Sequence, residues 1–186
     1  MSLKIIFFDM NKSFISSYQN VLQNNMSNTK FIHTDLDTLI KQNPFINAIV
    51  SPANSYGFMN GGIDRDINKI MNNIEIDVKQ RINQIGNYDS RGDRFLPVGK
   101  CEVVTKSNMH LFVAPTMMMP SKIKNGELNV MMAFYAILQK AFNMTQNGVH
   151  IVLACPCLGT GVGQMDPYES AKQILTAWNY FCERKN

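Results

Sequence analysis

Residues 48–64 read Ala48-Ile-Val-Ser-Pro-Ala-Asn54-Ser-Tyr-Gly-Phe-Met-Asn-Gly61-Gly62-Ile-Asp64, an apolar strand followed by a short loop with adjacent glycines. Because glycine has no side chain, such a loop brings backbone N–H groups close to a phosphorylated ligand. The same loop places the amide of Asn54 and the carboxylate of Asp64 at the rim of one pocket. The stretch therefore predicts a site for a nucleotide-derived ligand.

A second glycine-rich loop reads Cys155-Pro-Cys-Leu-Gly159-Thr-Gly161-Val-Gly163-Gln-Met165. It follows a buried strand and precedes a helix, where consecutive N–H groups hold phosphate without any Lys or Arg. It is not a Walker loop, because no Gly-Lys-Ser/Thr follows, and it comes too late in the chain for the dinucleotide fingerprint. Taken alone, it is either a tight strand-to-helix connection or a phosphate loop.

The composition is that of one globular domain spanning residues 1–186, with 45% hydrophobic and 17% charged residues. The net charge is +4 and the basic residues are scattered, which favours a small anionic ligand and disfavours nucleic acid. The apolar run at 5–8 is too short for a signal peptide or a membrane span. We therefore expect a cytoplasmic protein that does not contact a membrane.

The four Cys and three His do not have the spacing of a metal site. Cys155 and Cys157 form C-x-C and not the C-x-x-C of zinc knuckles, and Cys101 and Cys182 stand alone. We expect structural roles for these residues, no metal, no disulfide and a reducing compartment.

Short apolar runs of strand type alternate with segments of helical periodicity. Strands are expected at 4–9, 30–34, 48–51, 99–105, 111–114 and 150–154. Helices are expected after a cap at Asn11 or Ser13, over 36–41, in two pieces over 64–85, over 127–142 and from Asp166 onward. This alternation predicts an α/β protein, a three-layer α/β/α sandwich with a mixed central sheet, whose ligands bind at the carboxyl ends of strands.

The two loops together resemble those of the macro domain, the ADP-ribose-binding module. Its first loop has the form Asn-Ala-Ala-Asn followed by a glycine triplet and Val-Asp, and here Asn54 matches the last Asn. Asp64 stands ten residues later, the spacing seen in the family's hydrolytic branch. The segments 96–99 and 111–115 resemble two further parts of the family pattern, so that the likeness spans roughly residues 30 to 175.

The resemblance implies a role for each part of the site. Asp35 would accept a hydrogen bond from the exocyclic amine of adenine, with the backbone of Leu36 nearby, although Asp35 is also typical of a helix N-cap. Asn54 would hydrogen-bond the distal ribose hydroxyls. The backbone of the two loops would hold the diphosphate from both sides, through Gly61, Gly62, Ile63, Gly159, Thr160, Gly161, Val162 and Gly163.

Three departures from the family pattern affect the site. Pro52 removes one backbone donor, and Asn60 stands where the triplet has its first glycine. No aromatic residue follows Gly163 to cover the distal ribose. Tyr56 or Phe58 from the first loop would cover the sugar instead, or else pack into the core.

Asp64 separates the two main functional hypotheses. As a catalytic residue with Asn54, it would position or activate a water near C1″ of the distal ribose and hydrolyse a protein ester, a 1″-phosphate or an O-acetyl adduct. Alternatively, Asp64 only stabilises the start of a helix, where capping and the macrodipole favour Asp. In that case the protein would bind ADP-ribose or poly-ADP-ribose as a reader and would not hydrolyse it. RNA binding is a third class, which the scattered charge disfavours. We expect a monomer that binds ADP-ribose or an ADP-ribosylated protein and needs no cofactor.

Overall fold

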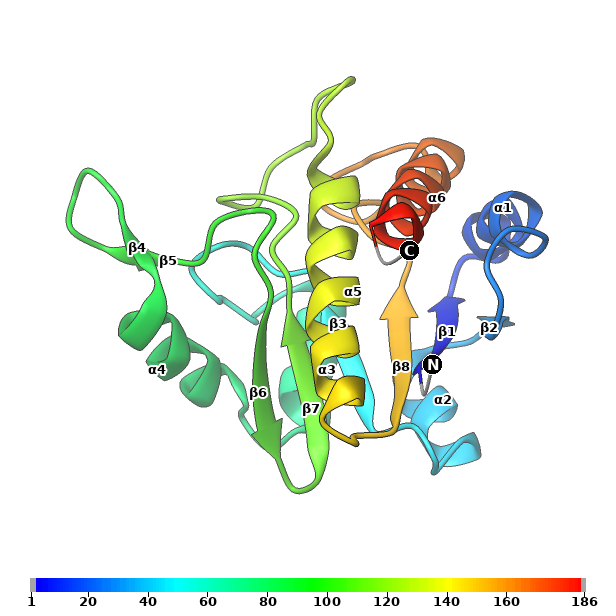
Figure 1. Ribbon diagram of the computed structural model, residues 1–186. Coiled ribbons are helices and arrows are strands. Elements are labelled where there is room, and N and C mark those ends of the chain that lie inside the picture. The colour runs from blue at the N-terminus through cyan, green and yellow to red at the C-terminus, as the bar shows by residue number, and fades with distance from the viewer. Residues whose placement is uncertain (1–2, 185–186) are drawn as a thin grey trace.

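The structure, a computed structural model, describes residues 3–184 and contains a six-stranded mixed sheet in the order β2-β1-β8-β3-β7-β6 (Figure 1). The five strands β2, β1, β8, β3 and β7 run parallel, and the edge strand β6 is antiparallel to β7. The strands are β1 Leu3–Asp9, β2 Thr29–His33, β3 Ala48–Ser51, β6 Glu102–Lys106, β7 Met109–Val113 and β8 Ile151–Pro156.

Six helices cover the two faces of this sheet in the described part of the chain (Figure 1). α1, α5 and α6 pack on one face, with Tyr18, Phe134 and Ile174 in that core. α2, α3 and α4 pack on the other, with Leu39 and Ile67 in a second core. The helices are α1 Lys12–Leu22, α2 Leu36–Gln42, α3 Gly62–Ile70, α4 Glu75–Ile85, α5 Asn129–Gln146 and α6 Pro167–Glu183. The expected three-layer α/β/α sandwich with a mixed sheet is confirmed.

Both faces of the central strands are buried, which explains their continuous apolar sequence. All four residues of β3 and all six of β8 are buried, and successive residues alternate between the two cores. The helix signals also hold. Asn11 caps α1, Asp166 caps α6 with Pro167 at its first turn, and the predicted pieces within 64–85 are α3 and α4.

Sequence periodicity did not reveal one small element, the hairpin of β4 Asn87–Tyr88 and β5 Arg94–Phe95. Each of its strands has only two residues, which is too short to show an alternation. The hairpin projects beyond α4, at the left of Figure 1. No helix within residues 3–184 is long and apolar enough to cross a membrane.

The topology brings the carboxyl ends of the five parallel strands to one edge of the sheet. Asp9 ends β1, Asp35 lies two residues after β2, and the loops 52–61, 114–128 and 157–166 follow β3, β7 and β8. In open α/β sheets this edge is where ligands bind.

Candidate functional site

A cavity of about 470 Å³ lies at this edge of the sheet. The volume is within the range of small-molecule sites. Every site residue predicted from the sequence lines this cavity. These residues are Asp35, Leu36, Asn54, Gly61, Gly62, Ile63, Asp64, Gly159, Thr160, Gly161, Val162 and Gly163. The two glycine loops, which are about a hundred residues apart in the chain, therefore meet at one cavity.

The second loop is shaped so that its backbone reaches the cavity. Gly159 has φ +71°, and a Cβ there would lie 2.8 Å from Val130 Cγ2, so only glycine fits without strain. A Cβ on Gly161 would meet nothing within 4 Å, which means that this residue borders open space. Among the described residues, none accepts a hydrogen bond from the backbone N–H groups of residues 159–163. These donors are available to an anionic ligand.

The first loop supplies a second set of donors through the start of α3. Gly61 is the N-cap residue, and no side chain caps the helix. The N–H groups of Gly62, Ile63 and Asp64 in the first turn have no acceptor within residues 3–184. A helix start of this kind carries a partial positive charge and binds anions. The cavity therefore has backbone donors on two sides, and Arg65 is the one Lys or Arg that residues 3–184 contribute to its lining.

The carboxylate of Asp64 is hydrogen-bonded to the end of the neighbouring strand β3. Its Oδ1 accepts a hydrogen bond of 2.6 Å from Ser51 Oγ, at the end of β3. Burial raises the pKa of Asp64 to about 6, and the bond from Ser51 opposes this rise. The simple capping interpretation is therefore wrong, because Gly61 occupies the N-cap position and Asp64 lies in the first turn. What remains is a half-buried carboxylate on the cavity wall whose pKa is close to neutral.

The amide of Asn54 is turned into its own loop. Its Oδ1 accepts hydrogen bonds from the backbone N–H groups of Tyr56 and Phe58, at 3.1 and 3.3 Å. Its Nδ2 donates to the Phe58 carbonyl at 2.9 Å. Asn54 thus organises the loop in the described structure, and its second amide hydrogen is the group left for a ligand.

Asp35 is the N-cap of α2 as well as a lining residue. Its two carboxylate oxygens accept from the backbone N–H and the hydroxyl of Thr38, at 2.9 and 2.8 Å. The hydrogen bonds from Thr38 lower the pKa of Asp35. A carboxylate has about four acceptor positions, so that capping leaves acceptor capacity on a residue that lines the cavity.

Two aromatic residues of the first loop have different positions. Phe58 is 40% exposed and lines the cavity, in the manner expected of a residue that covers a sugar. Tyr56 does not line the cavity, because its hydroxyl donates to Asp89 at 2.8 Å. Of the two alternatives, only Phe58 is placed to contact a ligand.

Sequence reasoning missed one wall of the cavity, which comes from β1 and the start of α1. Phe8, Asp9, Met10 and Phe14 line it. Burial raises the pKa of Asp9, whose carboxylate accepts from the Asn11 N–H at 2.8 Å. The sequence does show a carboxylate, Asp9, at the end of a predicted strand. The position of that strand in the sheet was needed to place Asp9 at the cavity. Thr116, Met117 and Pro120, after β7, were also missed.

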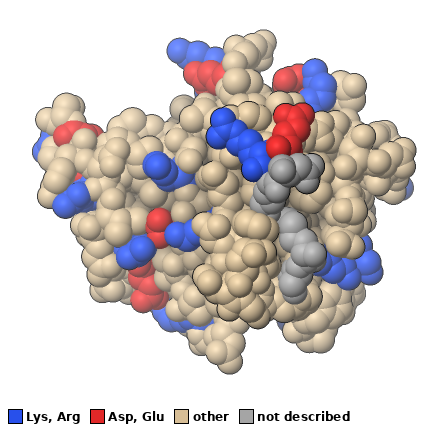
Figure 2. Space-filling model, in the orientation of Figure 1, with Lys and Arg blue, Asp and Glu red and all other residues tan. Residues whose placement is uncertain are grey.

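Of the cysteines and histidines in residues 3–184, only Cys157 lines the cavity. The four cysteines are free, and burial strongly raises the pKa of Cys101, Cys155 and Cys157. Across residues 3–184, no group of three or more His, Cys, Asp and Glu could hold a metal ion. The face shown in Figure 2 carries interspersed basic and acidic side chains.

Comparisons with known proteins agree with this geometry. The family model described as Macro domain matches residues 50–174, which is more than half of the chain. A comparison with curated protein sequences found no match. The match begins within β3 and therefore leaves out β1 and β2.

Solved structures share the fold at low sequence identity. The macrodomain of Mycobacterium tuberculosis DarG is 18% identical, with a TM-score of 0.57 over 73% of this chain and 82% of that one. An Oceanobacillus iheyensis macrodomain with ADP is 17% identical, with a TM-score of 0.55 over 75% and 70%. Thermosipho africanus DarTG in complex with ADP-ribose is 14% identical, with a TM-score of 0.51 over 71% and 35%.

Proposed function

This chain belongs to the macro domain family, and we propose that it binds ADP-ribose in the cavity at the carboxyl edge of its sheet. The observation that carries the proposal is the convergence of two sets of unpartnered backbone N–H groups, from 62–64 and 159–163, on one cavity. Such donors stabilise a diphosphate without a cluster of cations. A ligand with two phosphates between two sugars suits this arrangement.

The rest of the ligand follows from the walls on either side of the diphosphate. Asp35 lines the cavity and would accept a hydrogen bond from the exocyclic amine of adenine, with Leu36 against the base. Asp64, Asn54 and Phe58 also line the cavity and would hold the other end of the ligand. The distal ribose would lie there, with its face against the Phe58 ring and its hydroxyls near Asn54.

Hydrolysis of an adduct at the distal ribose is the activity that Asp64 supports. An aspartate with a pKa of about 6 is ionised at neutral pH and still basic enough to take a proton from water. The water oxygen would form the new bond at the adduct, the bond to the leaving group would break, and the proton held by Asp64 would pass to the departing oxygen. Ser51 would keep the carboxylate in one orientation through its hydrogen bond.

Binding without turnover is the second candidate. It is favoured by the state of Asn54, whose amide oxygen is used by the loop backbone, so that Asn54 could donate to a ligand but could not accept a proton from an attacking water. In that case the protein reads ADP-ribose, and Asp64 contributes only to the electrostatics of the α3 start. RNA binding gains no support from the face shown in Figure 2, where the charges are of mixed sign.

The expected partner is an ADP-ribosylated protein, bound by a monomer of this chain. A cytoplasmic location remains part of the same proposal.

The test is release of ADP-ribose from a mono-ADP-ribosylated protein, with Asp64→Ala as the variant and Asp77→Ala as the control. Asp77 also lies in the first turn of a helix, α4, but outside the cavity lining. Hydrolysis predicts release by the wild type and by Asp77→Ala and none by Asp64→Ala. Binding of ADP-ribose with no release from any adduct supports the reader, and no binding contradicts both.

A further inference from the structure

A hydrogen-bonded chain joins the β4–β5 hairpin to the ligand loop 52–61. The Tyr56 hydroxyl donates to Asp89 Oδ2 at 2.8 Å, across 33 residues of sequence. At the other end of the same residue, the Tyr56 N–H donates to Asn54 Oδ1 at 3.1 Å. Tyr56 thus touches the hairpin with its side chain and the cavity-lining Asn54 with its backbone.

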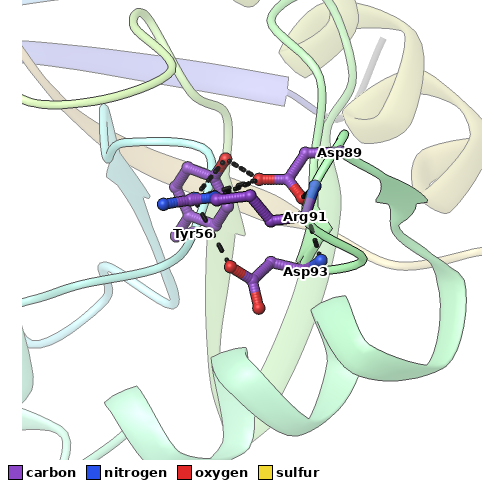
Figure 3. A network of polar contacts seen from close by, with 4 residues as sticks. All are labelled: Tyr56, Asp89, Arg91 and Asp93. Atoms are coloured by element: carbon purple, nitrogen blue, oxygen red, sulfur yellow. Dashed lines mark hydrogen bonds and ion pairs between the residues drawn. The ribbon is translucent and has the colours of Figure 1, made fainter.

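Several contacts hold Asp89, at the hairpin end of these hydrogen bonds. The side chain of Asp89 is only 7% exposed, and its Oδ1 accepts from the N–H groups of Arg91 and Asp93, at 2.8 and 2.9 Å. The Arg91 guanidinium lies 3.0 Å from Asp89 Oδ2 and 5.8 Å from the centre of the Tyr56 ring. Figure 3 shows Arg91 lying across the ring, with Asp89 and Asp93 on either side of it.

The ligand end of the chain is equally specific. Asn54 Oδ1 also accepts from the Phe58 N–H, and Asn54 Nδ2 donates to the Phe58 carbonyl. Asn54 and Phe58 both line the cavity. Their orientation depends on the backbone of Tyr56, because the Tyr56 N–H donates to Asn54 Oδ1. Gly57, between them, has φ +72°, and a Cβ there would lie 2.8 Å from Ile82 of α4. The loop therefore packs closely against α4 at Gly57, where a larger residue would clash.

We propose that Tyr56 is a positioning residue of the ADP-ribose site. Anchored by Asp89, it fixes Asn54 and Phe58 against the distal ribose without touching the ligand itself. The inference rests on the proposed function for the identity of the ligand. In this proposal the hairpin helps binding by fixing the positions of Asn54 and Phe58, which neither the glycine loops nor the carboxylates do. A site whose polar groups are held by neighbours in this way loses less entropy on binding.

Tyr56→Phe tests the proposal, because it removes the hydroxyl and keeps the ring. Tyr88→Phe is the matched control, since Tyr88 lies in the same hairpin, is 65% exposed and stacks under Arg94 outside the cavity lining. Hydrogen exchange of the Tyr56 and Phe58 amides is measured in the unliganded protein, and the Kd for ADP-ribose by calorimetry. Asp89→Asn is the conservative variant, because its oxygen can still accept from the N–H groups of Arg91 and Asp93 while its Nδ2 donates to the Tyr56 hydroxyl, so that a hydrogen bond of reversed direction remains.

The expected result for Tyr56→Phe is faster exchange at both amides and a Kd raised about threefold or more, with an unchanged unfolding temperature. Asp89→Asn should retain most of the affinity, and Tyr88→Phe should match the wild type in every measurement. Wild-type exchange rates and affinity in Tyr56→Phe would overturn the proposal. Absence of ADP-ribose binding by the wild type would overturn the proposed function instead, since amide exchange tests the positioning of the loop without ligand.

Discussion

Ser51 Oγ donates a hydrogen bond of 2.6 Å to Asp64 Oδ1, joining the end of β3 to the first turn of α3. The bond closes the ligand loop that lies between these two residues in the sequence. It also holds a carboxylate that burial makes unusually hard to ionise, with a pKa of about 6. Catalysis by Asp64 would depend on this pair, because the hydrogen bond orients the carboxylate and its pKa lies near neutral pH.

The pH dependence of hydrolysis should follow the ionisation of Asp64. A general base acts in its deprotonated form, so the rate should rise as the pH increases from 5 to 7 and level off above the pKa of about 6. Asp64→Asn should show no such rise. The check is the pH profile of ADP-ribose release under saturating substrate. A profile that is flat from pH 5 to 7 in the wild type would remove Asp64 as the base.

Replacing Ser51 should move that profile. The hydrogen bond from Ser51 stabilises the ionised carboxylate and lowers its pKa against the effect of burial. In Ser51→Ala the pKa of Asp64 should therefore rise further, and the midpoint of the pH profile should shift to higher pH. Titration of Asp64 by NMR gives the same quantity independently of activity. An unchanged midpoint would mean that the bond does not stabilise the charged form.

Asp64 should also cost stability at neutral pH. Its pKa is higher in the folded protein than its ordinary value of 3.8, so the folded state holds the proton more tightly and stability falls as the pH rises from about 4 to 6. Asp64→Asn removes this penalty and should raise the free energy of unfolding by about 2 kcal/mol at pH 7, allowing for partial exposure, with little change at pH 3.5.

Urea unfolding of both proteins at the two pH values provides the measurement. Asp77→Asn, which alters a carboxylate paired with Lys106 outside the cavity, is the control and should not increase stability at pH 7. A variant Asp64→Asn that is less stable than the wild type at pH 7 would contradict the prediction.

Asp35 combines a helix cap with the proposed recognition of adenine, and two substitutions separate them. Asp35→Asn keeps an oxygen to cap α2, whereas Asp35→Ala loses the cap and should cost roughly 1 kcal/mol of stability. Both should reduce the preference for ADP-ribose over its inosine analogue, which lacks the exocyclic amine, by about tenfold. Calorimetry with the two ligands measures that preference. A preference kept by Asp35→Asn would assign the residue to capping alone.

The sequence predicted the two glycine loops because their residues are consecutive and their requirements are local. A strand running into Asn54 and a glycine-rich turn before a capped helix can be recognised without knowing the fold. The pairing of the loops then followed from the rule that parallel strands end at one edge of the sheet. Asp35, two residues after the end of β2, lines the same cavity.

What the sequence did not reveal depends on contacts distant in the chain. The wall from Phe8 to Phe14 required the knowledge that β1 lies between β2 and β8. The role of Tyr56 required the hairpin that carries Asp89, and its strands are too short to leave a periodic pattern. The pKa of Asp64 required its burial. Each of these features depends on residues that are close in the fold but distant in the sequence.

The most direct test of the central claim is a calorimetric titration of ADP-ribose into the wild type, Gly161→Ala and Gly161→Val. A Cβ at Gly161 meets no protein atom within 4 Å, so these variants should unfold at wild-type temperature. Their side chains would occupy the space assigned to the diphosphate. The account predicts binding by the wild type, weaker binding by Gly161→Ala and none by Gly161→Val. Equal affinity in all three proteins would contradict the placement of ADP-ribose in this cavity.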